Sequence, residues 1–140
     1  MICINDAFED QVQITLNLII YEKAKTMEQK EQNVQALSSD LIEIVEKNHS
    51  FMKMLVGREI TTSPEGIFHI IVKFEITWKT KDWEIVSVAD NKEIIHSMLL
   101  EKKDFLNTIA ARESMMIAQI ISSIGIPPLI TPAEIILKAS

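Results

Sequence analysis

The predicted fold rests on one segment, Phe68-His69-Ile70-Ile71-Val72-Lys73-Phe74-Glu75-Ile76-Thr77-Trp78. Successive side chains of a β-strand point to opposite faces, so residues two apart share a face. One face of this stretch is apolar, with Phe68, Ile70, Val72, Phe74, Ile76 and Trp78. The other carries His69, Lys73, Glu75 and Thr77. The alternation predicts a long antiparallel strand with one buried face and one face in water.

Three further segments have strand character. Residues 12–20 alternate apolar Val12, Ile14, Leu16, Leu18 and Ile20 with polar residues, which predicts a half-buried strand. Residues 83–88 form a β-rich run after a polar tetrapeptide, so we expect them to pair with residues 68–78 as a hairpin. A short strand over residues 58–63 precedes a turn at Pro64-Glu65-Gly66. Together these segments predict a sheet of three or four strands.

Residues 27–55 show a different spacing. Their apolar positions recur at intervals of three and four residues in a segment that we read as helical: Val34, Leu37, Leu41, Ile44, Val45, Asn48, Met52 and Leu55. We therefore expect a long helix here, with a break near residues 48–50. Its charged side chains are expected to form a solvated face.

The C-terminal half predicts more helices. A short one covers residues 92–100, and a longer one covers residues 104–124, with Leu106, Ile109, Ile117, Ile120, Ile121 and Ile124 on its apolar side. Gly125 and Pro127-Pro128 end the longer helix. Thr131-Pro132-Ala133-Glu134 resembles a capping box that begins a terminal helix reaching Lys138. The expected fold is a single α+β domain over residues 1–140, with a small antiparallel sheet backed by helices.

Composition excludes several classes of protein. Of the 140 residues, 47% are hydrophobic, so the chain can form a core without disulfides or metals. The single cysteine, Cys3, rules out an internal disulfide and fits a reducing compartment, so we expect a cytoplasmic protein. Early acidic residues argue against an export signal, and no apolar run approaches the roughly 20 residues of a membrane span. A net charge of −6 disfavours nucleic acid as a partner.

Motifs for catalysis are missing from the sequence. His49, His69 and His96 are widely separated, and no G-x-S-x-G pattern occurs. Cys3 has no positive neighbour that would activate its thiol. The three glycines lie too far apart for a phosphate-binding loop. We therefore expect no enzyme, no cofactor and no metal, although carboxylate pairs keep a small enzyme open as a third possibility.

The chain is rich in methionine, with 7 in all. Adjacent Met115 and Met116 point to different sides of a helix, so burying both requires contacts on more than one side. Ordinary core packing with methionine as filler is one reading, and an oligomer interface or an adaptable groove for apolar peptides is the other. The residues predicted to bind are Met115, Met116, Ile120, Ile126, Pro127, Pro128, Leu129, Trp78 and Trp83.

The last third of the chain is similar to a known family. Ala111-Arg112-Glu113, the apolar helix that follows, Gly125-Ile126-Pro127-Pro128-Leu129 and Pro132 resemble the closing segment of the SecB-like protein-export chaperones. The resemblance covers roughly the final 60 residues. It implies an antiparallel sheet backed by helices, assembly into dimers or tetramers, and apolar grooves that hold unfolded preproteins without ATP.

The leading hypothesis is therefore a SecB-like chaperone or holdase. It would bind extended apolar segments of unfolded or partner polypeptides without catalysis. The alternative is a structural or regulatory homo-oligomer that reuses this fold, for example in a phage or mobile element. On its own, an Arg112–Glu113 pair is equally well read as a structural ion pair or as helix-surface contacts.

Overall fold

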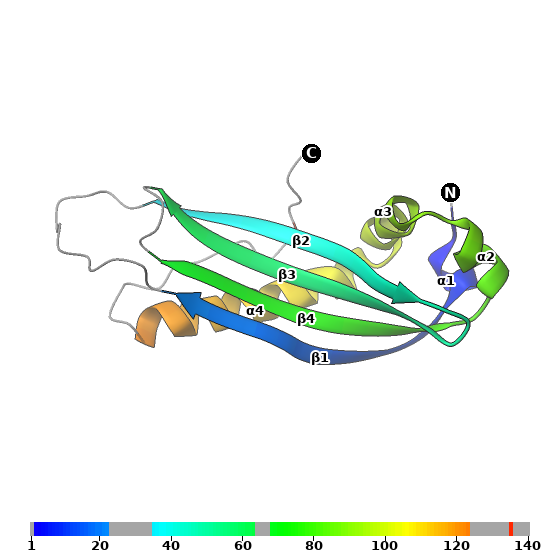
Figure 1. Cartoon of the computed structure of the whole chain (residues 1–140), viewed down its shortest axis with the longest axis horizontal. Coiled ribbons are helices and arrows are strands. Elements are labelled where there is room, and N and C mark those ends of the chain that lie inside the picture. The colour runs from blue at the N-terminus through cyan, green and yellow to red at the C-terminus, as the bar shows by residue number, and fades with distance from the viewer. Residues whose placement is uncertain (1, 23–34, 64–67, 124–134, 136–140) are drawn as a thin grey trace.

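The computed structural model describes residues 2–22, 35–63, 68–123 and 135 (Figure 1). The described chain begins with the short helix α1 and the strand β1, continues through three more strands, and ends in three helices. The elements are α1 (Ile4–Ala7), β1 (Phe8–Glu22), β2 (Gln35–Lys47), β3 (Phe51–Ser63), β4 (His69–Thr80), α2 (Trp83–Val88), α3 (Asn91–Glu101) and α4 (Lys103–Ser123).

The four strands form one antiparallel sheet in the order β1-β4-β3-β2. This confirms the expected α+β class and the antiparallel sheet of three or four strands. The alternation of residues 68–78 is confirmed as well, because Ile70, Val72, Phe74, Ile76 and Trp78 are all buried on one face of β4. The predicted strand over residues 12–20 is the central part of β1, and the one over residues 58–63 is the end of the longer β3.

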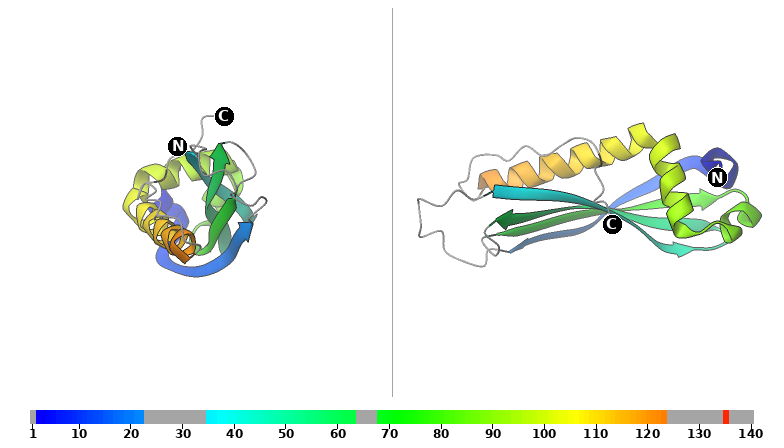
Figure 2. Two further views of the ribbon diagram at one scale, coloured as in Figure 1. Left: turned by 90° about the vertical axis from the view of Figure 1, so that its left-hand side faces the viewer. Right: turned by 90° about the horizontal axis from the view of Figure 1, so that it is seen from above.

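Helix α4 lies along one face of the sheet, which we call the inner face (Figure 2). Figure 1 looks onto the opposite, outer face, and α4 is seen behind the strands. The inner face and α4 enclose the core, in which Leu106, Ile109, Ile117 and Ile121 of the helix are buried. The ring of Phe105 packs edge-on against buried Trp78, with ring centroids 5.4 Å apart. The sheet therefore has one face packed on the core and one face left for another role.

The predicted helix over residues 27–55 is wrong where the structure describes it. Residues 35–47 and 51–63 are the paired strands β2 and β3. A bulge between Ile44 and Glu46 shifts the alternation by one residue, so the spacing of Leu41, Ile44 and Val45 imitates a helix. The side-chain oxygen of Asn48 accepts hydrogen bonds from the backbone N–H groups of Ser50 and Phe51 at 2.8 and 2.9 Å, which turns the chain into a hairpin.

The predicted strand over residues 83–88 is also wrong, because this segment is helix α2. Both edges of β4 are already paired, with β1 on one side and β3 on the other. No position beside β4 is left for a hairpin partner. Asp82 instead caps α2 by accepting a hydrogen bond from the backbone N–H of Glu84 at 3.1 Å.

The other helix predictions agree with the structure. The expected helices over residues 92–100 and 104–124 correspond to α3 and α4. The Pro64-Glu65-Gly66 turn, the Gly125 cap and almost all of the expected terminal helix lie outside the described residues. None of the helices described is both long enough and apolar enough to cross a bilayer.

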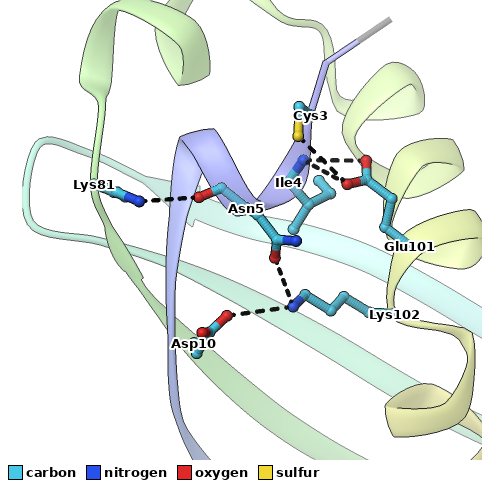
Figure 3. A network of polar contacts seen from close by, with 7 residues as sticks. All are labelled: Cys3, Ile4, Asn5, Asp10, Lys81, Glu101 and Lys102. Atoms are coloured by element: carbon cyan, nitrogen blue, oxygen red, sulfur yellow. Dashed lines mark hydrogen bonds and ion pairs between the residues drawn. The ribbon is translucent and has the colours of Figure 1, made fainter.

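A polar network fixes α1 to the junction between α3 and α4 (Figure 3). Both carboxylate oxygens of Glu101 accept from the backbone N–H of Ile4, at 3.2 and 3.1 Å. Lys102 donates to the side chain of Asn5 at 2.9 Å and forms an ion pair with Asp10 at 3.5 Å. Ile4 and Ala7 are fully buried beneath these contacts. The network therefore sets where β1 enters the sheet.

Candidate functional site

The outer face of the sheet carries a row of apolar side chains that the core does not absorb. The strand registers place six such residues on it, opposite in direction to the buried ones: Leu18, Ile20, Leu37, Leu41, Leu55 and Ile71. Leu37 and Leu41 are 52% and 44% exposed, and none of the six belongs to the core cluster. No described helix lies over this face in Figure 1. Charged residues of the same face, such as Glu59, Lys73 and Glu75, lie between these apolar side chains. Exposed apolar side chains on an uncovered sheet face make it a candidate site of interaction.

A depression lies in the middle of this face, at Gly57. Leu41 of β2 and Lys73 of β4 flank Gly57 directly across the three strands. Because glycine has no side chain, the aliphatic stem of Lys73 comes close to it, and a Cβ atom at Gly57 would lie 2.9 Å from Lys73 Cγ. The depression has a volume of about 450 Å³. Besides Leu41, Gly57 and Lys73, its lining consists of Ser39, Asp40, Ile42, Arg58, Glu59 and Ile71. We call it the Gly57 depression.

A second hollow of about 530 Å³ lies toward the hairpin end of the sheet. The side chains that line it include Gln13, Phe51, Thr77 and Lys79. Lys53 lies over the Phe51 ring, with Nζ 5.3 Å from its centroid. This hollow combines one aromatic surface, which the lining of the Gly57 depression does not include, with amide and hydroxyl groups.

A buried ion pair lies under the Gly57 depression, on the inner face. The guanidinium of Arg58 donates to both carboxylate oxygens of Asp40, from Nε at 2.7 Å and from Nη2 at 3.0 Å. Its third nitrogen, Nη1, donates to Ser114 Oγ on α4 at 2.6 Å. The Arg58 side chain is fully buried and that of Asp40 is 3% exposed. This arrangement joins β2, β3 and α4 and holds the floor of the depression rigid.

Glu113 lies beside this ion pair on α4 and is fully buried. Neither of its carboxyl oxygens has a hydrogen-bond partner among the described residues. Burial raises the pKa of Glu113 to about 9, an effect that Arg58 opposes and Asp40 reinforces. The carboxyl group is therefore protonated at neutral pH.

The sheet edge formed by β1 is a third feature of the surface. Among the described strands, β1 pairs with β4 alone, and on its other side no described strand pairs with its backbone groups. Residues 11–21 contain no charged residue, no proline and no glycine. The opposite edge, β2, carries Asp40, Glu43, Glu46 and Lys47. Charges protect an edge strand from pairing with another chain, so β1 is the less protected edge.

The structure separates the residues predicted to bind. Met115 is 64% exposed on α4, whereas Met116 and Ile120 are partly buried against the core. Trp78 is 2% exposed beneath α4. Trp83 is partly buried at the start of α2 and packs against His49, with ring centroids 4.7 Å apart and the ring planes tilted by 42°. Ile126, Pro127, Pro128 and Leu129 lie outside the described residues, and no measurement tests any of these roles.

Sequence reasoning missed the residues of the outer face. Leu37, Leu41 and Leu55 were assigned to the apolar side of a helix, and Gly57 received no structural role. Two signals pointed to the strands: the alternation Met52-Lys53-Met54-Leu55-Val56 and the turn-forming Asn48-His49-Ser50. The placement of His69 on the wetted face is confirmed, since it is partly exposed and bonded to outer-face Glu59 at 2.6 Å. Within the described chain no cluster of three His, Cys, Asp or Glu residues could hold a metal.

Comparison with known proteins connects this geometry to one fold. No protein-family model matches the sequence, and no curated protein matches it. Among solved structures, the SecB-like chaperone Rv1957 of Mycobacterium tuberculosis, in complex with a ChAD peptide from the HigA1 antitoxin, matches with a TM-score of 0.56. The match covers 88% of this chain and 86% of that one at 9% sequence identity. The resemblance seen in the C-terminal sequence thus extends over most of the structure, and this chain has the SecB-like fold.

Proposed function

We propose that this chain is a SecB-like, non-catalytic binding protein that holds extended apolar segments of unfolded or partner polypeptides on its outer sheet face. One observation carries the proposal: the apolar row on that face, with the Gly57 depression at its centre, is left outside the core. The structural neighbour with the same fold was solved with a peptide bound, which supports a binding role.

The size of the Gly57 depression suits large apolar side chains of an extended segment. Burying one Leu-sized side chain contributes roughly 1.5–3 kcal/mol, and several weak contacts along Leu37, Leu41 and Ile71 add to it. Binding of this kind requires no unique client sequence. The chain has a single cysteine, Cys3, whose thiol is free and exposed. A free thiol of this kind supports a cytoplasmic setting for the protein.

Aggregation of a chemically unfolded client, followed by light scattering, tests the proposal. The unmodified protein is expected to suppress scattering at a few-fold molar excess, and Leu41→Ser is expected to weaken suppression several-fold. Val88→Ser is the matched control, because Val88 is 85% exposed on α2, away from the outer face. Equal suppression by both variants, or none by the folded wild-type protein, would contradict the proposal.

We also propose that two copies assemble through their β1 edges into a continuous eight-stranded sheet. Leu16 and Ile19, each 44% exposed, both lie on the inner face, because the bulge between Leu16 and Leu18 shifts the alternation. Antiparallel pairing that sets Leu16 of one copy opposite Ile19 of its partner keeps inner residues against inner residues. In this register the exposed apolar side chains cover each other across the two-fold axis.

The charges of β1 fit this register. Glu22 would lie opposite the uncharged Gln13 of the second copy. Glu9 and Asp10 fall outside the paired stretch, and each already faces a lysine within its own chain, Lys79 at 3.7 Å and Lys102 at 3.5 Å. No like charges therefore face each other across the junction.

Disulfide trapping tests the assembly. In a Cys3→Ser background, a mixture of Leu16→Cys and Ile19→Cys proteins is expected to form a crosslinked dimer under mild oxidation, since directly opposed strand residues have Cβ atoms about 4.5–5.5 Å apart. A mixture of Leu16→Cys and Leu37→Cys, the latter on the β2 edge, is the control. A monomeric mass in solution together with absent crosslinking would rule the assembly out.

The aggregation and crosslinking experiments together also distinguish client binding from the alternative role on the same fold. A dimer that forms through β1 but does not suppress aggregation would favour a structural or regulatory homo-oligomer on the same fold. That outcome would leave the assembly in place and remove the client-binding function.

A further inference from the structure

We propose that Glu113 is a buried neutral acid in the contact between α4 and the sheet, and that its ionisation loosens this contact beside Arg58 of β3. This inference does not depend on the binding function. It concerns a group that neither polypeptide binding nor assembly uses.

The geometry around Arg58 supports it first. Asp40 accepts hydrogen bonds from two of the three guanidinium nitrogens, at 2.7 and 3.0 Å, so the pair is already neutral as a unit. The third nitrogen donates to Ser114, the residue next to Glu113 on α4. A charged Glu113 would add a net negative charge to a cluster whose positive charge is matched.

Burial supports it second. Glu113 is 0% exposed, and no described residue donates a hydrogen bond to either oxygen. A buried carboxylate without donors is far less stable than a buried carboxylic acid. The neutral form of Glu113 is therefore the one that fits the contact between α4 and the sheet.

The other surfaces that pack on α4 provide no alternative charge. The β4 residues on the inner face, from Ile70 to Trp78, are all apolar, and the buried residues of α3 are Ile94, Ser97 and Met98. His96 of α3 is exposed. Arg58 and Asp40 are thus the charged groups that face Glu113 from the described elements.

The dependence on pH follows in sign from these facts. The folded protein keeps the Glu113 proton up to about pH 9, whereas the unfolded chain releases it near 4.5. The stabilisation from this group is complete below the lower value and is lost as pH rises toward the higher one. Raising the pH therefore destabilises the contact between α4 and the sheet.

Urea unfolding between pH 5 and 9 tests the proposal with wild type and Glu113→Gln. The unfolding equilibrium constant of the wild type relative to the variant is expected to rise by up to about tenfold per pH unit, because one proton is released on unfolding. Glutamine has the size of the protonated acid and is also neutral, but it does not titrate. The variant should therefore lose the part of the pH dependence of stability that comes from Glu113. Parallel pH curves for the two proteins would overturn the proposal.

An infrared measurement on the wild type covers the case in which the variant fails to fold. A carbonyl band of a protonated carboxylic acid is expected to persist at pH 7 and to disappear on unfolding at the same pH. If every carboxyl of the folded protein is ionised at pH 7, the proposal is wrong whatever the variant does.

Discussion

Arg58 of β3 and Asp40 of β2 lie directly opposite each other and form a two-bond ion pair beneath α4. The pair lies on the inner face, and the neighbouring residues Gly57 and Leu41 form part of the depression on the outer face. The backbone segment that forms the floor of the candidate binding site is therefore fixed by a buried charge pair. This connection between the two faces leads to the predictions below.

Asp40→Asn leaves the buried guanidinium of Arg58 without its counter-charge. We expect the variant to lose about 3 kcal/mol of unfolding free energy, because breaking one side of a buried pair exposes the full desolvation cost of the other. Glu43→Gln is the control, since Glu43 is exposed on the same strand. Urea unfolding at pH 7 measures both, and equal stabilities would contradict the prediction.

Asp40→Asn should also change how stability depends on pH. Asp40 raises the pKa of Glu113 and Arg58 lowers it, so removing Asp40 leaves only the lowering influence of Arg58 against burial. The pKa of Glu113 in the folded variant should fall. The pH range over which the stabilisation from Glu113 is lost should therefore end at a lower pH than in the wild type. Urea unfolding measures this effect: between pH 7 and 9 the unfolding free energy of the variant should change less than that of the wild type.

Gly57→Ala fills the depression with one methyl group. The new Cβ would approach Lys73 Cγ at 2.9 Å, so the partly exposed Lys73 side chain must shift. We expect a stability change within about 1 kcal/mol, since alanine in a strand also removes the entropic cost of glycine. Client holding should weaken several-fold in the light-scattering assay. An unchanged assay would mean that clients do not use the Gly57 depression.

Met115→Ser decides whether α4 contributes to binding, as the methionine content predicts. Met115 is 64% exposed, so stability should change by less than about 0.5 kcal/mol. If clients bind only to the outer face, aggregation suppression stays at the wild-type level. A loss as large as that of Leu41→Ser would place the client on the helix side instead.

The strands β1 and β4 and the helices α3 and α4 could be predicted from the sequence. Their hydrophobic periods are long, and local spacing alone assigns the buried faces of β4 and α4. In β1, which has two register shifts, the shift between Leu16 and Leu18 places Leu18 and Ile20 on the outer face, opposite to Val12 and Ile14. The segment containing β2 and β3 was misassigned because a bulge near Val45 altered the period. Such a bulge is defined by the partner strand, whose identity is a long-range property of the fold.

The residue pattern alone predicts an α+β chain with an apolar sheet face, a covering helix and no recognisable catalytic motif. The folded arrangement is needed to show that β4 lies between β1 and β3, that Arg58 meets Asp40 and lies near Glu113, and that a depression at Gly57 lies on an uncovered face. The reason is physical: periodicity reports which side of an element is buried, whereas charge pairing and surface shape depend on which distant elements are brought side by side.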